Sequence, residues 1–210
     1  MLKIISVLAW TLVIGCAGFS NEPTFTETPH YNQIDAGSYR IEIDTSFELA
    51  DAVTGKRRLP NVDVQSSSAK HTRYLLVKGR RNIDKVIIVT ITDLVDAHHF
   101  FRTEASFSSS DAPGILDRGY REAGQVKCAY CVRKVPRFGR KFGGILAKKG
   151  YSMADCDCAM EVRYAKNAGR SRWLSVIYFE GMPATWAEIG SEEVDRAIRH
   201  ADEFIRISKP

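Results

Sequence analysis

Recognisable catalytic motifs are missing from this 210-residue sequence. It has no phosphate-binding glycine loop, no His-Glu-x-x-His pair and no Gly-x-Ser-x-Gly elbow. The corresponding nucleotide-binding, zinc-protease and serine-hydrolase mechanisms are therefore excluded. Cysteine is scarce, at five residues, and the only long apolar run lies near the N-terminus. We expect no catalytic residue, no metal and no cofactor, and a binding or structural role.

Composition is that of an ordinary globular protein with a mild basic excess. The hydrophobic fraction is 44% and the net charge is +5. A chain of this length is long enough to bury a core as one domain. The positive charge favours anionic partners, such as phospholipid head groups or an anionic envelope polymer, as well as protein partners.

The first sixteen residues form a charged and then apolar segment. Lys3 precedes an apolar run of eleven residues from Ile4 to Ile14, followed by Gly15-Cys16. Such a run is too short to span a bilayer but has the length of the apolar part of a secretory signal. The tetrapeptide Val13-Ile14-Gly15-Cys16 resembles the lipobox of bacterial lipoproteins.

That resemblance implies a processed and lipid-anchored protein. Residues 1–15 would be a signal peptide, and Cys16 would be acylated after cleavage and would insert its acyl chains into the lipid bilayer. Ala17 follows Cys16, and by analogy with lipoprotein sorting this favours the outer membrane, with the protein facing the periplasm. Three acyl chains give a firm anchor, whereas one gives only weak binding.

Residues 16–36 are predicted to be a flexible tether, because they carry Pro23 and Pro29 and little apolar periodicity. A single domain is predicted over 37–210.

Strands are predicted from two kinds of pattern. Polar and apolar residues alternate over 39–44, and apolar runs cover 73–78, 85–92 and 172–179. Residues 161–166 are predicted to pair with 172–179 as a hairpin across Asn167–Arg170. The polar stretch 51–72 is predicted to be a long loop.

One amphipathic helix is predicted at the C-terminus, over 191–207. Its apolar stripe consists of residues 194, 197, 198, 201, 204 and 205, and Glu192 and Glu193 suit its positive N-terminus. The predicted fold class is α+β, a largely antiparallel sheet of about six to seven strands with this long helix on one face. The layout is loosely similar to the α/β/α sandwich of PsbP-like and Mog1-like domains, without any matching functional motif.

Four further cysteines lie at 128, 131, 156 and 158. An even number in an exported chain favours disulfides. If the two segments run antiparallel, Cys128 pairs with Cys158 and Cys131 with Cys156, with a bulge that absorbs one residue. The crossed pairing is the second choice. Two alternatives stay open: a zinc site of all four cysteines, and a periplasmic thiol-redox pair of Cys128 and Cys131.

A basic loop lies between the two cysteine pairs. It contains Arg133, Lys134, Arg137, Arg140 and Lys141, interleaved with two phenylalanines. These cations are candidates for binding anionic lipid or an acidic polymer, while a solvated hairpin is the simpler interpretation. Nucleic acid is not expected in the predicted compartment. Glu180 and Tyr178, near the end of the last strand, are predicted to line a cleft, but the sequence places no second catalytic group beside them.

Overall fold

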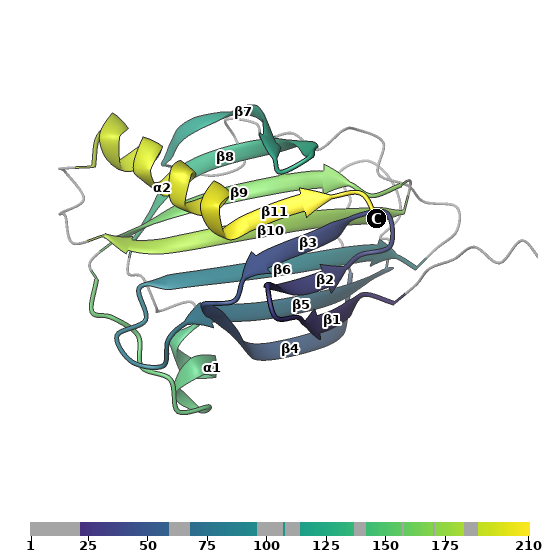
Figure 1. The fold of residues 1–210 in the computed structure, drawn as a ribbon, viewed down its shortest axis with the longest axis horizontal. Helices are drawn as coiled ribbons and strands as arrows, with labels where there is room; N and C mark the ends of the chain where they lie inside the picture. Colours follow the sequence, from purple (N-terminus) through teal and green to yellow (C-terminus); the bar gives the residue numbers. More distant parts are fainter. Residues whose placement is uncertain are drawn as a thin grey trace, which may run out of the picture.

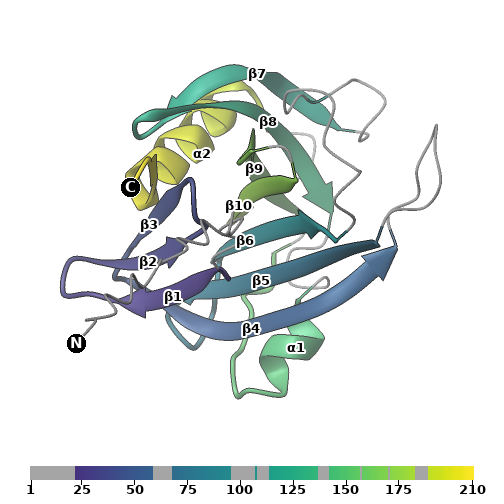
Figure 2. The same cartoon turned by 90° about the vertical axis from the view of Figure 1, so that its right-hand side faces the viewer.

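A computed structural model describes residues 22–58, 68–95, 107, 114–136, 142–156, 158–169, 171–182 and 189–210. Over these residues the chain forms two antiparallel sheets, of seven and four strands, and two helices. The larger sheet is strongly curved, and the smaller sheet and helix α2 lie against its concave face (Figures 1 and 2). The protein is therefore built mainly from β-strands.

The larger sheet is antiparallel throughout. Its strands, in spatial order, are β4 (Phe47–Arg58), β5 (Ser68–Lys78), β6 (Lys85–Leu94), β10 (Arg172–Met182), β9 (Cys158–Asn167), β8 (Val126–Pro136) and β7 (Ile115–Ala123). One end of this sheet holds the last residue of β4, and we call it the Arg58 end. The opposite end holds the last residue of β5 and the first of β6, and we call it the Lys78 end.

The smaller sheet joins both ends of the described chain. Its order is β1 (Thr24–Glu27), β2 (Tyr31–Asp35), β3 (Arg40–Asp44) and β11 (Ile205–Ser208). Helix α2 (Ser191–Phe204) runs directly into β11. The N–H of Gly190 donates to the Glu193 carboxylate at 2.9 Å, which begins the helix in the manner of half a capping box.

Apolar side chains cover both faces of the larger sheet. On the concave face, Leu76, Val89 and Val176 share one core with Ile41 of the smaller sheet and Ala201 of α2. On the convex face, α1 (Gly143–Ala147) inserts Leu146 into a second cluster, which contains Leu75, Val86, Ile88, Ile177 and Phe179. Burying one such aliphatic side chain stabilises the fold by about 2 kcal/mol. Central strands β6 and β10 are therefore apolar on both faces.

Three contacts fasten the two sheets together near the Arg58 end. Lys70 on β5 forms an ion pair with Glu22 at 2.6 Å. Arg172 binds Asp93 through two nitrogens and also donates to the carbonyl of Ala36 at 2.8 Å. The third contact is a hydrogen bond at 2.9 Å from the N–H in the β7–β8 turn to the carbonyl of Ile207 in β11.

The predicted fold class is wrong. The described chain is mainly β, because the smaller sheet supplies a second β-layer that was not foreseen, and α2 covers only part of the concave face. The helix begins at Ser191 as expected but ends at Phe204, and the next four residues form β11. Ile205 and Ile207 alternate with polar neighbours, so they fit a strand as well as a helix stripe.

The predicted tether is also corrected from residue 22 onward. Strands β1 and β2 lie inside the range 16–36, and Ile34 is fully buried. Asn32 is buried as well, and its amide donates to the carbonyl of Phe47. Residues 51–58 extend β4 rather than opening a loop, because an edge strand tolerates polar side chains on its exposed side.

Candidate functional site

The most chemically elaborate cluster of the described chain centres on a buried carboxylate, Glu180. One oxygen, Oε2, accepts a hydrogen bond from the Tyr178 hydroxyl at 3.0 Å and contacts Nδ1 of His200 at 2.8 Å. The other oxygen, Oε1, lies 3.4 Å from Nζ of Lys85. The Glu180 side chain is only 8% exposed. A carboxylate buried to this extent requires such partners, since removing a charge from water without them is costly.

Three separate elements bring these groups together. Glu180 and Tyr178 lie two residues apart on β10, so their side chains point to the same concave face. Lys85 begins β6 and is the register partner of Glu180. His200 stands on α2, one turn before Phe204, and its ring lies 6.3 Å from the Phe204 ring. The cluster therefore joins α2 to the larger sheet.

Electrostatics keep Lys85 and Tyr178 protonated as hydrogen-bond donors. Burial acts to lower the pKa of Lys85, but its hydrogen bond to Asp84 and the charges of Glu180 and Asp84 outweigh burial and raise that pKa. Burial first, and then the neighbouring charge of Glu180, raises the pKa of Tyr178. An ammonium and a phenol thus both point at the carboxylate at neutral pH. This arrangement suits a structural lock between helix and sheet.

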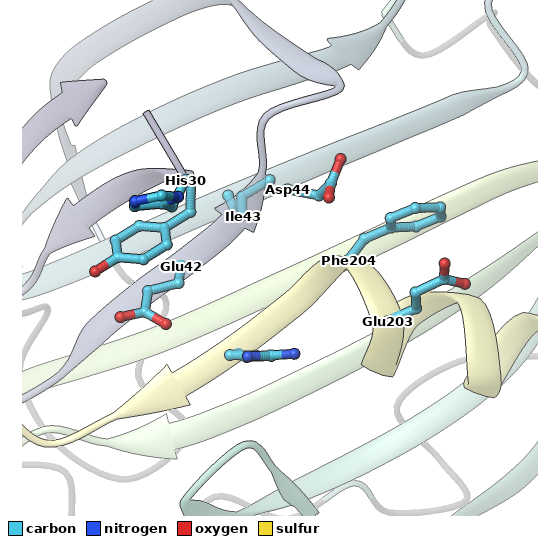
Figure 3. A pocket seen from close by; sticks show the side chains of 8 residues that line it. His30, Glu42, Ile43, Asp44, Glu203 and Phe204 are labelled. Carbon is cyan, nitrogen blue, oxygen red and sulfur yellow. The ribbon is translucent and has the colours of Figure 1, made fainter. Parts of the chain in front are cut away.

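A shallow pocket lies on the other side of Phe204. Its volume is about 170 Å³, and Figure 3 shows His30 and Glu42 on one side and Phe204 and Glu203 on the other. The lining is completed by Tyr31, Ile43, Asp44 and Arg206. Three carboxylates face one arginine here, so the pocket favours cationic or hydrogen-bond-donating groups. It is smaller than the roughly 300–1,000 Å³ typical of sites that enclose organic ligands.

Phe204 separates the pocket from the Glu180 cluster. Its ring centroid lies 6.1 Å from that of Tyr178 and 5.3 Å from that of Phe47. The ammonium of Lys78 lies 4.5 Å from the Phe204 centroid, within the range of a cation–π contact. A group that entered the pocket would therefore meet a ring that is held from behind by a packed, charged cluster.

Arg133, the first cation of the predicted basic loop, is directed into the sheet face. Its Nη2 donates to the fully buried Glu161 at 2.7 Å, and Arg163 donates to the other oxygen of Glu161, also at 2.7 Å. This use of Arg133 differs from the predicted anion contact. Lys134 lies on β8, and its N–H donates to the carbonyl of Gly114. The predicted anion ligands Arg137, Arg140 and Lys141 lie outside the described residues, as do Cys16 and the signal segment.

The strand register separates the cysteines that were expected to pair. Cys158 lies opposite Pro136, whereas Cys128 is eight residues back along β8. At about 3.4 Å per residue, roughly 27 Å separates Cys128 from Cys158 along the sheet. A disulfide needs Cα atoms within about 7 Å.

The second pair and the crossed alternative meet the same obstacle. Cys131 lies opposite Arg163, five residues from the position that faces Cys158, which is about 17 Å along β8. Cys156 packs against the convex-face cluster, while Cys128 and Cys158 belong to the concave-face core. These four cysteines form no disulfide in this structure. They are not gathered as a zinc site or as a thiol-redox pair either.

Sequence reasoning found Tyr178 and Glu180 but missed Lys85 and His200. Lys85 can be assigned to the cluster only when β6 is known to pair with β10, and the sequence did not predict that pairing. His200 lies on the flank of the apolar helix stripe, four residues before Phe204, and that spacing is its one sequence signal.

Comparisons with protein-family models, with curated proteins and with solved structures each found no match to this chain. Among the described residues, neither helix combines the length and apolarity needed to cross a bilayer. Within the same part of the chain, no three His, Cys, Asp or Glu side chains gather in a way that could hold a metal ion.

Proposed function

We propose that the protein is a lipid-anchored, non-enzymatic binding protein of the bacterial cell envelope. The observation that carries this proposal is the lipobox Val13-Ile14-Gly15-Cys16. Its cysteine stands six residues before Glu22, which forms an ion pair with the larger sheet. Six extended residues reach about 20 Å. An acylated Cys16 would thus hold the folded domain close to the bilayer.

The two ends of the domain suit two different roles, membrane attachment at one end and partner binding at the other. The chain enters the fold through Glu22, whose partner Lys70 lies toward the Arg58 end. The shallow pocket reaches Asp44, at the far end of β3, and therefore lies toward the Lys78 end. A strand of eleven residues, such as β5, is about 37 Å long. The pocket would consequently face the aqueous compartment, where a partner could reach it.

We propose no catalytic role for Glu180, because its contacts with neighbouring side chains are structural. Glu180 receives hydrogen bonds or charge from three side chains, and the contact with His200 joins α2 to the sheet. A carboxylate so occupied acts as a packing element. The zinc alternative would need gathered ligands, and no such group is found among the described residues. The thiol-redox alternative would need Cys128 and Cys131 to meet, but they lie three residues apart on β8 and so point to opposite faces.

The test is an intact-mass measurement on chain extracted from bacterial membranes with detergent. The expected mass lacks residues 1–15 and includes the acyl groups on Cys16. Cys16→Ser should abolish both changes. Cys156→Ser is the matched control, because it removes another cysteine outside the lipobox and should leave acylation intact. Recovery of the unprocessed wild-type chain from the soluble fraction, with Met1 present and Cys16 unmodified, would refute the proposal.

A further inference from the structure

The shallow pocket beside Phe204 is bordered by side chains of both charges that have no partner in the described chain. Glu42 on β3 and Arg206 on β11 are register partners, so both side chains leave the same face of the smaller sheet. Among the described residues, neither of them forms an ion pair or a side-chain hydrogen bond. Glu203, at the end of α2, is equally unpaired within this part of the chain. These three charged groups are therefore available to a ligand.

Negative charge predominates around this pocket. Its lining contains a third carboxylate, that of Asp44, which accepts a hydrogen bond from the N–H of Ser46 at 2.8 Å. Hydrogen bonds from Ser46 are the main cause that lowers the pKa of Asp44, so this carboxylate is ionised at neutral pH. Lys78 is not part of the lining, and its ammonium lies over the Phe204 ring at 4.5 Å. Three carboxylates thus border the pocket together with one guanidinium.

The end of helix α2 adds to this negative charge. Glu203 and Phe204, which both line the pocket, are the last two residues of the helix. A helix C-terminus carries a partial negative charge that favours cations, and the last turn of α2 contains no basic residue. The pocket therefore lies where a cationic group is stabilised by the backbone as well as by side chains.

The size and the aromatic lining of the pocket limit what it can hold. Its volume is about 170 Å³. A cavity of about 150 Å³ takes up benzene, so this pocket suits a compact ligand or one end of a longer one. Tyr31 and Phe204 contribute aromatic surface to the lining, against which a short alkyl chain can pack. Figure 3 shows Glu42 and Phe204 on opposite sides of the space that such a ligand would fill.

We propose that this pocket binds a small basic amino acid, a ligand with one carboxylate, a short alkyl chain and two ammonium groups. The ligand carboxylate pairs with the Arg206 guanidinium, and the ammonium groups pair with Glu42 and Glu203. A diamine leaves Arg206 unpaired and an acidic amino acid meets like charge, so the lining discriminates against both. This inference rests on the proposed binding function and does not require the acyl anchor on Cys16.

The experiment is isothermal titration calorimetry on the full chain in detergent, at low ionic strength, with L-ornithine as the ligand. Putrescine is the matched comparison, because it is the same diamine without the carboxylate, and L-glutamate has the opposite net charge. We expect ornithine to bind with millimolar affinity. Putrescine should bind about tenfold more weakly, since it lacks the charge-assisted contact with Arg206. Glutamate should not bind measurably.

Variants assign each contact to its side chain. Arg206→Gln should weaken ornithine binding about tenfold without weakening putrescine binding, whereas Glu203→Gln should weaken both. Glu192→Gln is the matched control, since Glu192 is an exposed carboxylate in the first turn of α2, at the other end of the helix. The control should leave both affinities unchanged. Circular dichroism establishes that each variant is folded.

The outcomes separate this inference from the proposed anchor. Absence of ornithine binding at millimolar concentrations, or equal affinities for ornithine and putrescine, overturns the assignment of a basic amino acid. Equal losses in Glu203→Gln and Glu192→Gln overturn the location of the site. An unprocessed chain that binds ornithine supports the pocket while the intact mass refutes the anchor. The comparison of the three ligands uses the wild type alone and stands even if a variant fails to fold.

Discussion

Replacing Glu180 with glutamine tests whether its ionic cluster holds α2 on the sheet. The substitution keeps the volume and the hydrogen-bonding capacity but removes the charge that faces Lys85. Both partners are well buried, at 17% exposure for Lys85 and 8% for Glu180. Breaking a buried ion pair from one side typically costs about 3–5 kcal/mol. Because Lys85 keeps its contact with Asp84, we expect about 3 kcal/mol for Glu180→Gln.

Urea unfolding followed by circular dichroism measures this loss of unfolding free energy. In a protein of this size, about 3 kcal/mol also lowers Tm by roughly 6–12 °C. Glu48→Gln is the control, since Glu48 pairs with Arg80 at the surface, where a salt bridge contributes at most about 1 kcal/mol. Adding Lys85→Met to Glu180→Gln removes the unbalanced ammonium and should restore about 1 kcal/mol or more.

Two results would refute this reasoning. Equal, small losses in Glu180→Gln and Glu48→Gln would mean that the buried cluster contributes no more than a surface pair. Additive losses in the Lys85→Met and Glu180→Gln double variant would mean that the two side chains do not interact.

Three further predictions concern the core, a turn and the thiols. Burial raises the pKa of Cys128 from 9.0 to about 11, so its contribution to stability is complete below pH 9 and is lost as the pH rises through 11. At pH 10 the free energy of unfolding should be about 1 kcal/mol lower for this reason. Urea unfolding at pH 8 and at pH 10 should show this difference in the wild type but not in Cys128→Ala. Gly124→Ala should cost several kcal/mol, because the added Cβ would lie 2.9 Å from the backbone of Ile207 at a positive φ. Gly144→Ala in α1 meets nothing within 4 Å and should be neutral or slightly stabilising; equal melting temperatures for the two variants would contradict this. Finally, the mass of the purified chain should be the same with and without reductant, and a loss of two hydrogens per cysteine pair would show that the strand register is wrong.

Periodicity predicted the elements with strong local signals. The hairpin of β9 and β10 is confirmed, with Trp173 opposite Asn167 and Phe179 opposite Glu161. The apolar run that became β6 is central and covered on both faces, as its composition indicated. In these segments the burial of each side chain follows from its neighbours in sequence, so local pattern and tertiary structure agree.

Strands that depend on distant partners could not be predicted in this way. β2 offers one strong apolar residue, Ile34, and buries Asn32 only because the carbonyl of Phe47 accepts its amide proton. β4 has no apolar residue after Val53, and its second half is defined by pairing with β5. The cysteine pairing failed for the same reason, since the true register of β8 and β9 is shifted by eight residues from the one that Cys128 and Cys158 require.

The smaller sheet unites residues 24–44 with residues 205–208. During synthesis, the first three strands can therefore pair with β11 only after almost the whole chain has been made. Pairings between such distant segments form slowly, because a long loop must close before they yield any stabilisation. Removal of the last six residues should then leave β3 with an open edge and expose Ile41 and Ile43, a state prone to aggregation. The edge of the smaller sheet beside β3 is thus covered only when the four-residue strand β11 is in place.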